Sequence, residues 1–130
     1  MEKNNERSST NTLIMEIEKK LLKKLNEFYD TKETEIVSAS VKVTNLKLKN
    51  IKDTLISIGN IVDEDLKEET YVGYIKSGAF SLNRAYVAVG KDDDKAIMVV
   101  YSPEGLIKQN TSKKAIEKFK KEIKEIAKYN

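Results

Sequence analysis

Three runs of strand-forming residues between positions 71 and 101 constrain the fold of this chain more than any other feature. They cover 71–76, 85–89 and 96–101, and turn-forming residues separate them. β-Branched and aromatic residues fit a pleated, half-buried surface, and each run has the length of an ordinary strand. We therefore predict an antiparallel three-stranded meander, on which the rest of the chain packs.

Two segments near the ends of the chain have the period of an amphipathic helix. Apolar residues recur three and four positions apart over about 12–29 and again over about 112–128. That spacing gathers them on one face of a helix. We predict that both helices pack this face on the same side of the sheet. Residues 1–11 are polar and lack periodicity, and for them we predict a disordered tail.

The segment 35–49 alternates apolar and polar residues, but the phase of the alternation changes partway. Apolar residues hold odd positions up to Val43 and even positions from Leu46 onward. In a strand, a shift of one residue sends side chains to the opposite face. Either a bulge or a turn near Asn45 restores the phase, or two strands meet there. Of these alternatives, we predict one long strand with a β-bulge near Asn45.

Residues 50–66 leave two interpretations open. Their apolar residues are spaced as on one face of a helix, Asn50 with Asp53 resembles an N-terminal capping pair, and Gly59 suits a left-handed helix end. The run 54–58 is also typical of a strand. An acidic connector over 63–69 follows in either case.

These elements predict an α+β fold with a single domain over residues 12–130. The antiparallel sheet would contain the long strand and the meander, and the N-terminal and C-terminal amphipathic helices would pack on it. The same order of elements occurs in PH-like small barrels with a C-terminal helix, which is the alternative fold. Such an analogy of order carries no function.

The absence of cysteine and histidine restricts the chemistry of the chain. Disulfides and thiolate metal sites are excluded, and the commonest general base and metal ligand are missing. The acidic run 92–94 lacks the alternating ligands of a calcium loop, and neither phosphate-binding glycine motifs nor serine-nucleophile motifs occur. We expect no cofactor, no metal and no enzymatic activity. An enzyme that works through a carboxylate of raised pKa is the catalytic alternative.

No apolar run approaches the roughly 20 residues of a membrane span. The first residues carry two acidic side chains and no apolar segment of the kind that a secretory signal has. We expect no membrane span and a cytoplasmic location.

The positive charge of the chain is concentrated in its last helix. Residues 112–130 carry seven lysines against three glutamates, whereas the net charge of the whole chain is +3. The first turn of this helix contains two lysines, where free N–H groups and the helix dipole favour an anion. The candidate anion-binding residues are Lys113, Lys114, Lys118 and Lys121. The alternative interpretation is a solvated face that pairs with the acidic connector.

By exclusion, the sequence predicts a non-catalytic binding or adaptor module that acts through a protein partner or through self-association. The alternative is binding of nucleic acid or another polyanion through the last helix. Two tyrosines beside basic residues, Tyr74 and Tyr86, would be available for base stacking, although buried strand tyrosines are the more ordinary interpretation. If the run 46–49 lies at a sheet edge, its lysines would block aggregation or flank a partner's strand.

Overall fold

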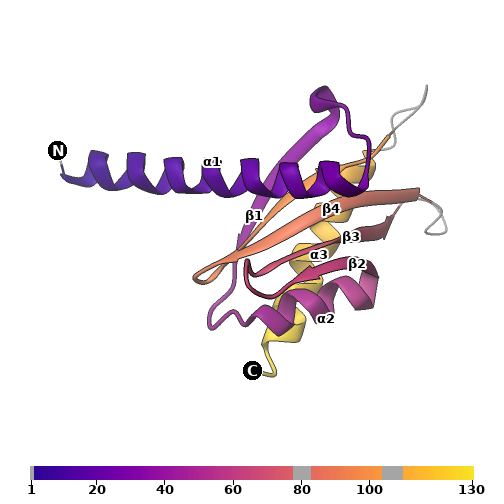
Figure 1. The fold of residues 1–130 in the computed structure, drawn as a ribbon. Coiled ribbons are helices and arrows are strands. Elements are labelled where there is room, and N and C mark those ends of the chain that lie inside the picture. Colours follow the sequence, from indigo (N-terminus) through magenta and orange to yellow (C-terminus); the bar gives the residue numbers. More distant parts are fainter. Residues whose placement is uncertain (1, 78–82, 104–109) are drawn as a thin grey trace.

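The fold is an antiparallel sheet with helices on both of its faces (Figure 1). The computed structural model describes the backbone of residues 2–77, 83–103 and 110–130, and within these the side chains of all residues except 2–12 and 33. The elements are, in order, α1 (Glu2–Phe28), the 3-10 helix η1 (Glu33–Glu35), β1 (Ile36–Lys42), α2 (Leu48–Ile58), β2 (Gly59–Asp65), β3 (Thr70–Ser77), β4 (Asn83–Asp92), β5 (Lys95–Tyr101) and α3 (Thr111–Ala127).

The predicted meander is confirmed as β3, β4 and β5, which pair antiparallel in sequence order. β1 adds to β5 and β2 adds to β3, so the described strands lie in the order β1-β5-β4-β3-β2. β1 and β2 are the two edges and do not pair with each other. The predicted α+β class is correct, whereas the PH-like barrel is wrong because the sheet stays open.

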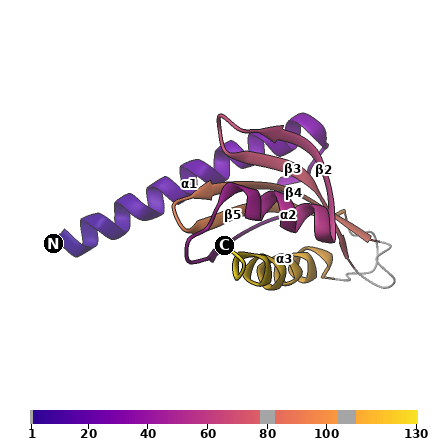
Figure 2. The same cartoon turned by 90° about the horizontal axis from the view of Figure 1, so that it is seen from below.

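The two terminal helices cover opposite faces of the sheet, with α2 beside α3 (Figure 2). Leu21 and Leu25 of α1 pack on one face, whereas Phe119 and Ile123 of α3 pack on the other. The prediction that both helices share one face is therefore wrong. Its physical reason is visible in β5, whose consecutive residues 96–100 are all buried, and in β4, where the same holds for 87–89. A strand that is apolar on both faces needs cover on both.

The phase change near Asn45 marks the end of a strand, so the predicted β-bulge is wrong. β1 ends at Lys42, and Asn45 then adopts a left-handed conformation with φ of 58°. The N–H of Val43 still donates to the carbonyl oxygen of Asp94 at 2.7 Å. Leu46 is buried in the turn, and α2 begins two residues later. A turn between two elements explains the shift in phase as well as a bulge does.

The helical interpretation of residues 50–66 holds up to Ile58, whereas the strand interpretation of the run 54–58 is wrong, because that run lies in α2 and β2 begins only at Gly59. The helical stripe is real through Ile58, but Val62 and Leu66, which continue it in the sequence, are 46% and 64% exposed. The helix ends at Gly59 with an extended backbone, φ −169°, and not in the left-handed region. A Cβ at Gly59 would overlap the carbonyl oxygen of Tyr74, so close approach of two strands explains the glycine. Three of the seven residues of the predicted connector, 63–65, belong to β2.

Helix α1 begins ten residues earlier than the sequence predicts, at Glu2. Its N-terminal half extends beyond the sheet on the side of β1 (Figure 1). The structure thus continues the helix through the segment assigned to a disordered tail, and the mobility of residues 1–11 in solution stays a prediction. No helix in the described ranges is both long enough and apolar enough to cross a bilayer.

Candidate functional site

The four candidate lysines are all exposed on α3, but the helix does not bring all four together. Lys114, Lys118 and Lys121 are spaced by four and three residues and so share one side of the helix. Lys113 lies about 100° around the axis from its neighbour. The structure therefore supports a group of three lysines on one side and places the fourth apart.

Neighbouring glutamates reduce the positive charge of this surface, and one of its lysines is hydrogen-bonded within the protein. Glu117 and Glu125 each lie four residues from Lys121, within reach of it on the helix surface. A hydrogen bond from Lys128 and its charge lower the pKa of Glu125. The ammonium of Lys118 donates to the carbonyl oxygen of Lys76 at 2.8 Å.

The first turn of α3 is packed and not open as an anion site requires. Thr111 and Ser112 are both buried. The hydroxyls of Ser112 and Ser102 are hydrogen-bonded to each other at 2.7 Å. Asn110, before the helix, has φ of 53° and makes no side-chain cap bond. Residues 104–109, which precede Asn110, lie outside the described residues.

The acidic connector pairs with α1 and α2, so its predicted pairing with α3 is wrong. Three ion pairs carry this arrangement: Lys20 with Glu68, Lys24 with Asp65, and Lys52 with Glu64. The Lys24 pair has an N to O distance of 2.6 Å and is partly buried. Lys52 reaches Glu64 from α2, which contacts β2. The two pairs of α1 have a topological cause, because α1 and the β2–β3 turn lie on the same side of the sheet. The lysines of α3 lie on the other.

The sheet tyrosines are occupied by each other and by an arginine. The guanidinium of Arg84 lies over the ring of Tyr74 at 4.4 Å from its centroid. Tyr86 contacts Tyr29, with ring centroids 4.1 Å apart, and stacks near Tyr101 at 6.5 Å. A nucleic-acid base that stacked on Tyr74 or Tyr86 would therefore have to displace one of these neighbours.

The acidic run 92–94 forms the turn between β4 and β5. Asp92 pairs with Lys95 across a two-residue loop, and Asp93 has φ of 52°. Aspartate tolerates this left-handed geometry better than most residues. Within the described residues, no three acidic side chains gather as metal ligands would.

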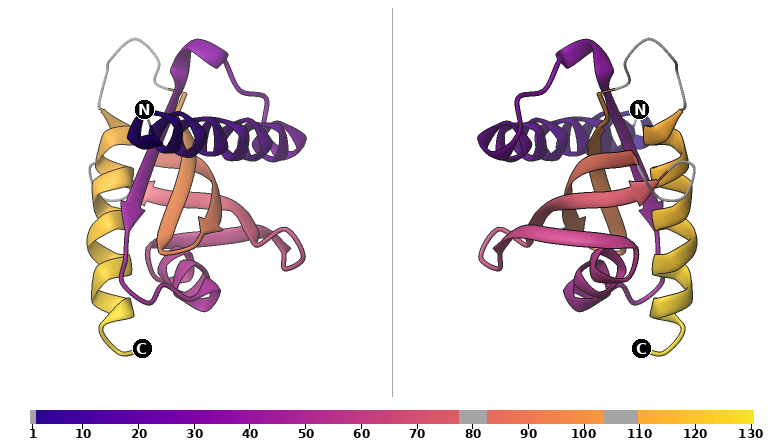
Figure 3. Two further views of the ribbon diagram at one scale, coloured as in Figure 1. Left: turned by 90° about the vertical axis from the view of Figure 1, so that its left-hand side faces the viewer. Right: turned by 90° about the vertical axis from the view of Figure 1, so that its right-hand side faces the viewer.

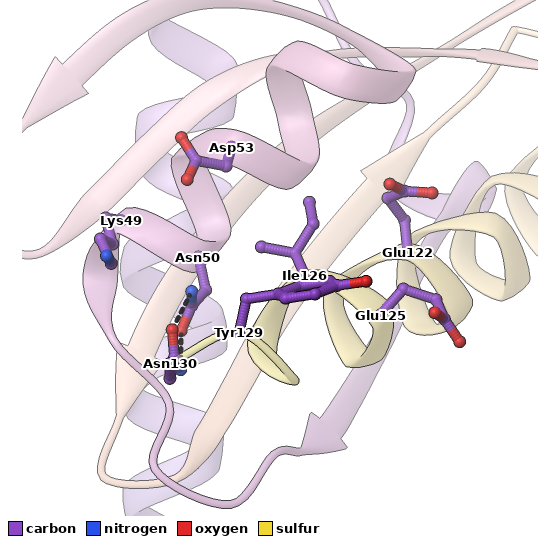
Figure 4. A pocket seen from close by; sticks show the side chains of 8 residues that line it. All are labelled: Lys49, Asn50, Asp53, Glu122, Glu125, Ile126, Tyr129 and Asn130. Atoms are coloured by element: carbon purple, nitrogen blue, oxygen red, sulfur yellow. Dashed lines mark hydrogen bonds between the residues drawn. The ribbon is translucent and has the colours of Figure 1, made fainter.

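A cleft of about 440 Å³ lies between α2 and the end of α3 (Figure 4). Its lining residues are Lys49, Asn50, Asp53, Glu122, Glu125, Ile126, Tyr129 and Asn130. The carboxylates do not converge on one point: Ile126 and Tyr129 separate Asp53 from Glu125 (Figure 4). Glu122 accepts from Ser57 at 3.2 Å, and Glu125 accepts from Lys128 at 2.9 Å. A general acid needs a raised pKa, whereas that of Glu125 is lowered.

The strand predicted over 35–49 is present as β1, but its position at an edge of the sheet was not predicted from the sequence. Within the described part of the chain it is hydrogen-bonded only to β5. It carries no charged residue before Lys42, and Val37 is 42% exposed. Figure 3 shows β1 at the margin of the sheet, with α1 crossing near one end of it and α3 running beside it.

The free backbone groups of β1 can be assigned from its pairing. Val43 donates to Asp94, so the odd-numbered residues exchange hydrogen bonds with β5. The two-residue turn at 93–94 agrees, because it commits Lys95 to β4. The N–H and C=O groups of the even-numbered residues therefore point outward: Ile36, Ser38, Ser40 and Lys42.

An apolar groove of about 160 Å³ runs between α1 and this edge. It is lined by Met15, Glu18, Lys19, Leu22, Ile36, Ser38 and Val99. The exposed side chains of Leu13 and Met15 continue the apolar surface along α1. An open strand edge and an apolar groove thus lie side by side.

The opposite edge, β2, is protected in the ways that natural sheets use. A bulge interrupts its register between Ile61 and Asp63, and three of its seven residues are acidic. Bulges and charges both discourage pairing with another strand. The condition stated for the run 46–49, that it lies at a sheet edge, is not met, because Leu46 is buried in a turn and Leu48 starts α2. The signal that could have found β1 is its serine-rich, uncharged composition.

Comparison with protein-family models gives no match for this chain, and comparison with curated protein sequences gives none either.

Proposed function

We propose that the chain is a non-catalytic binding module that joins a protein partner, or another copy of itself, by adding a strand to the β1 edge. Strand addition uses main-chain hydrogen bonds for affinity and neighbouring pockets for specificity. The observation that carries the proposal is the row of outward N–H and C=O groups on β1, beside an apolar groove.

The contrast between the two edges supports a functional role for β1. Unprotected edges are an aggregation hazard, and natural proteins normally blunt them. Here β2 carries a bulge and acidic residues, whereas β1 carries neither over residues 36–41. An edge left open in a chain that protects its other edge fits a surface that a partner covers.

The test compares two variants for retention of a partner from extracts of the producing cells and for self-association of the purified chain. Ser40→Pro removes one outward N–H and leaves the β1–β5 ladder intact, because proline is tolerated at an edge. The control reverses charge on α3 by changing Lys113, Lys114, Lys118 and Lys121 to glutamate. We expect the edge variant to lose the partner and the helix variant to keep it. The reverse result would overturn the proposal.

A second proposal is binding of nucleic acid or another polyanion through α3. It rests on Lys114, Lys118 and Lys121, which share one side of the helix, and on Arg84 and Lys76, which are paired at the end of the sheet that Lys118 reaches. The glutamates that lie among these lysines on α3 reduce the positive charge of the helix and so argue against this second proposal. Fluorescence anisotropy of labelled single- and double-stranded oligonucleotides tests it, since phosphate contacts weaken steeply as salt rises.

The cytoplasmic location expected from the sequence stays a prediction.

A further inference from the structure

We propose that the strand which adds to β1 is β1 of a second copy of this chain, paired antiparallel about a two-fold axis at Ala39. This inference rests on the proposed function and names its partner. Two-fold assemblies use the same patch on both copies, so the patch must be complementary to itself. β1 meets that condition in its sequence, its hydrogen-bonding groups and its two faces.

The sequence of β1 is symmetric about Ala39. Residues 37–41 read Val-Ser-Ala-Ser-Val, which is the same in both directions. In an antiparallel pair centred on Ala39, each residue faces its mirror position in the second copy. Valine then lies opposite valine, and serine lies opposite serine.

The hydrogen-bonding groups also match in this register. Ser38 would face Ser40 of the second copy, and both present their backbone N–H and C=O groups outward. Ile36 and Lys42 are related in the same way. Ala39 bonds to β5, so the central pair is not hydrogen-bonded and its side chains approach closely. No outward group between Ile36 and Lys42 is left without a partner.

On the face toward α2 and α3, the pairing would cover exposed apolar surface. Val37 is 42% exposed, whereas Val41 is 5% exposed and belongs to the core cluster. Each Val37 would lie directly opposite Val41 of the second copy, where cross-strand pairs of β-branched residues are stabilising. The core of one copy would thereby continue into the other.

On the face toward α1, the groove is lined by one carboxylate, that of Glu18, and by one ammonium, that of Lys19. Lys42 of the second copy would lie opposite Ile36, which lines the groove together with Glu18. Its aliphatic stem would cover apolar surface while its ammonium stays near the carboxylate. The same contact would repeat at the symmetry-related end.

The two α1 helices would fit on this face without collision. α1 crosses β1 where Ile36 and Ser38 line the groove. In the two-fold pair, the second helix would cross four residues further along the strand, at about 13 Å. Packed helices need only about 8–10 Å between their axes. The overhang of each α1 would then extend over the sheet of the other copy.

Oxidative cross-linking tests the register, because the chain has no cysteine of its own. In the proposed pair, the two Ala39 positions are about 4.5 Å apart between Cα atoms, within the range of a disulfide. The two Val37 positions would be about 13 Å apart. We expect Ala39→Cys to form a disulfide-linked dimer under mild oxidation and Val37→Cys, the matched control, to form none. Equal cross-linking of both, or of neither, would overturn the register.

Charge exchange at two exposed serines provides a second test that does not touch the core. Ser38→Lys with Ser40→Lys would place like charges opposite each other and should abolish the dimer in sedimentation velocity. Ser38→Lys with Ser40→Glu would place opposite charges together and should restore it. If the wild-type chain sediments as a monomer at every concentration, the proposed β1–β1 dimer is wrong. In that case, a cellular partner lost on Ser40→Pro would still support the proposed function, whereas a partner that is kept would refute both.

Discussion

The side-chain amides of Asn50 and Asn130 exchange two hydrogen bonds, with N to O distances of 2.9 and 2.8 Å. Asn50 is buried at the start of α2, and its oxygen also accepts from the backbone N–H of Lys47 at 2.8 Å. Asn130 follows α3 and donates to the carbonyl oxygen of Asn45 at 3.0 Å. One buried amide thus caps a helix and joins two elements distant in sequence.

We predict that Asn50→Ala lowers the free energy of unfolding by roughly 1–3 kcal/mol, because it leaves buried groups without partners. Urea denaturation followed by circular dichroism measures this. Asn60→Ala is the control, since Asn60 is exposed and bonds only to the next backbone N–H among the described contacts. Its effect should stay within about 0.5 kcal/mol. Equal losses would show that the amide pair contributes no special stability.

The β2–β3 pair depends on two glycines that face each other's strands. A Cβ at Gly73 would overlap the carbonyl oxygen of Asn60. We predict that Gly73→Ala lowers the free energy of unfolding by roughly 1–3 kcal/mol, because the backbone of the neighbouring strand β2 must move to make room for the Cβ. Gly90→Ala is the matched control: its Cβ would meet the flexible tip of Leu21 at 3.3 Å. Chemical denaturation should rank the glycine at 73 as the more costly to replace, and the opposite order would contradict the strand geometry.

Tyr71 makes the stability of the protein sensitive to alkaline pH. Its burial, followed by the charge of Glu64 and a hydrogen bond to it at 3.3 Å, raises its pKa to about 12. The unfolded tyrosine ionises near pH 10, so above that pH the folded state holds more protons than the unfolded state. The contribution to stability is complete below pH 10 and is lost as pH rises toward 12.

Unfolding in urea at pH 8, 10 and 11 checks this for the wild type and Tyr71→Phe. We expect the free energy of unfolding to fall less steeply between pH 10 and 11 in the variant. A parallel decline in both proteins would assign the alkaline sensitivity to other groups, of which Tyr29 is one because burial also raises its pKa.

Leu21 anchors α1 to its own face of the sheet. It is fully buried against a cluster that includes Val72 and Ala88. We predict that Leu21→Ala lowers the free energy of unfolding by roughly 2–5 kcal/mol. Leu13→Ala, on the exposed part of the same helix, should change it by no more than about 0.5 kcal/mol. Similar values for both leucines would mean that α1 does not pack on this face.

The ion pair between Lys24 and Asp65 ties α1 to the edge strand β2. We predict a coupling energy of about 0.2–1 kcal/mol in a double-mutant cycle with alanine at each position. The coupling should weaken at high salt because part of the pair is exposed. The more exposed pair of Lys20 and Glu68 should couple less strongly. If neither pair shows a coupling energy, these ion pairs do not help to hold α1 on the sheet.

Local pattern was enough for the elements, and only the tertiary structure decided how they meet. The meander was predictable because runs of β-branched and aromatic residues carry their own strand signal. The face of the sheet that each terminal helix covers was not predictable. Periodicity shows which residues of a helix turn toward the core, but it does not show on which side of the sheet the helix lies.

Edge status is likewise a property of the pairing between β1 and β5, whose paired residues lie about 60 positions apart in the chain. The lysines of α3 were visible in the sequence because charge is a local property. The outward groups of Ser38 and Ser40 were not visible, because the direction of a backbone N–H is set by the strand that it does or does not face.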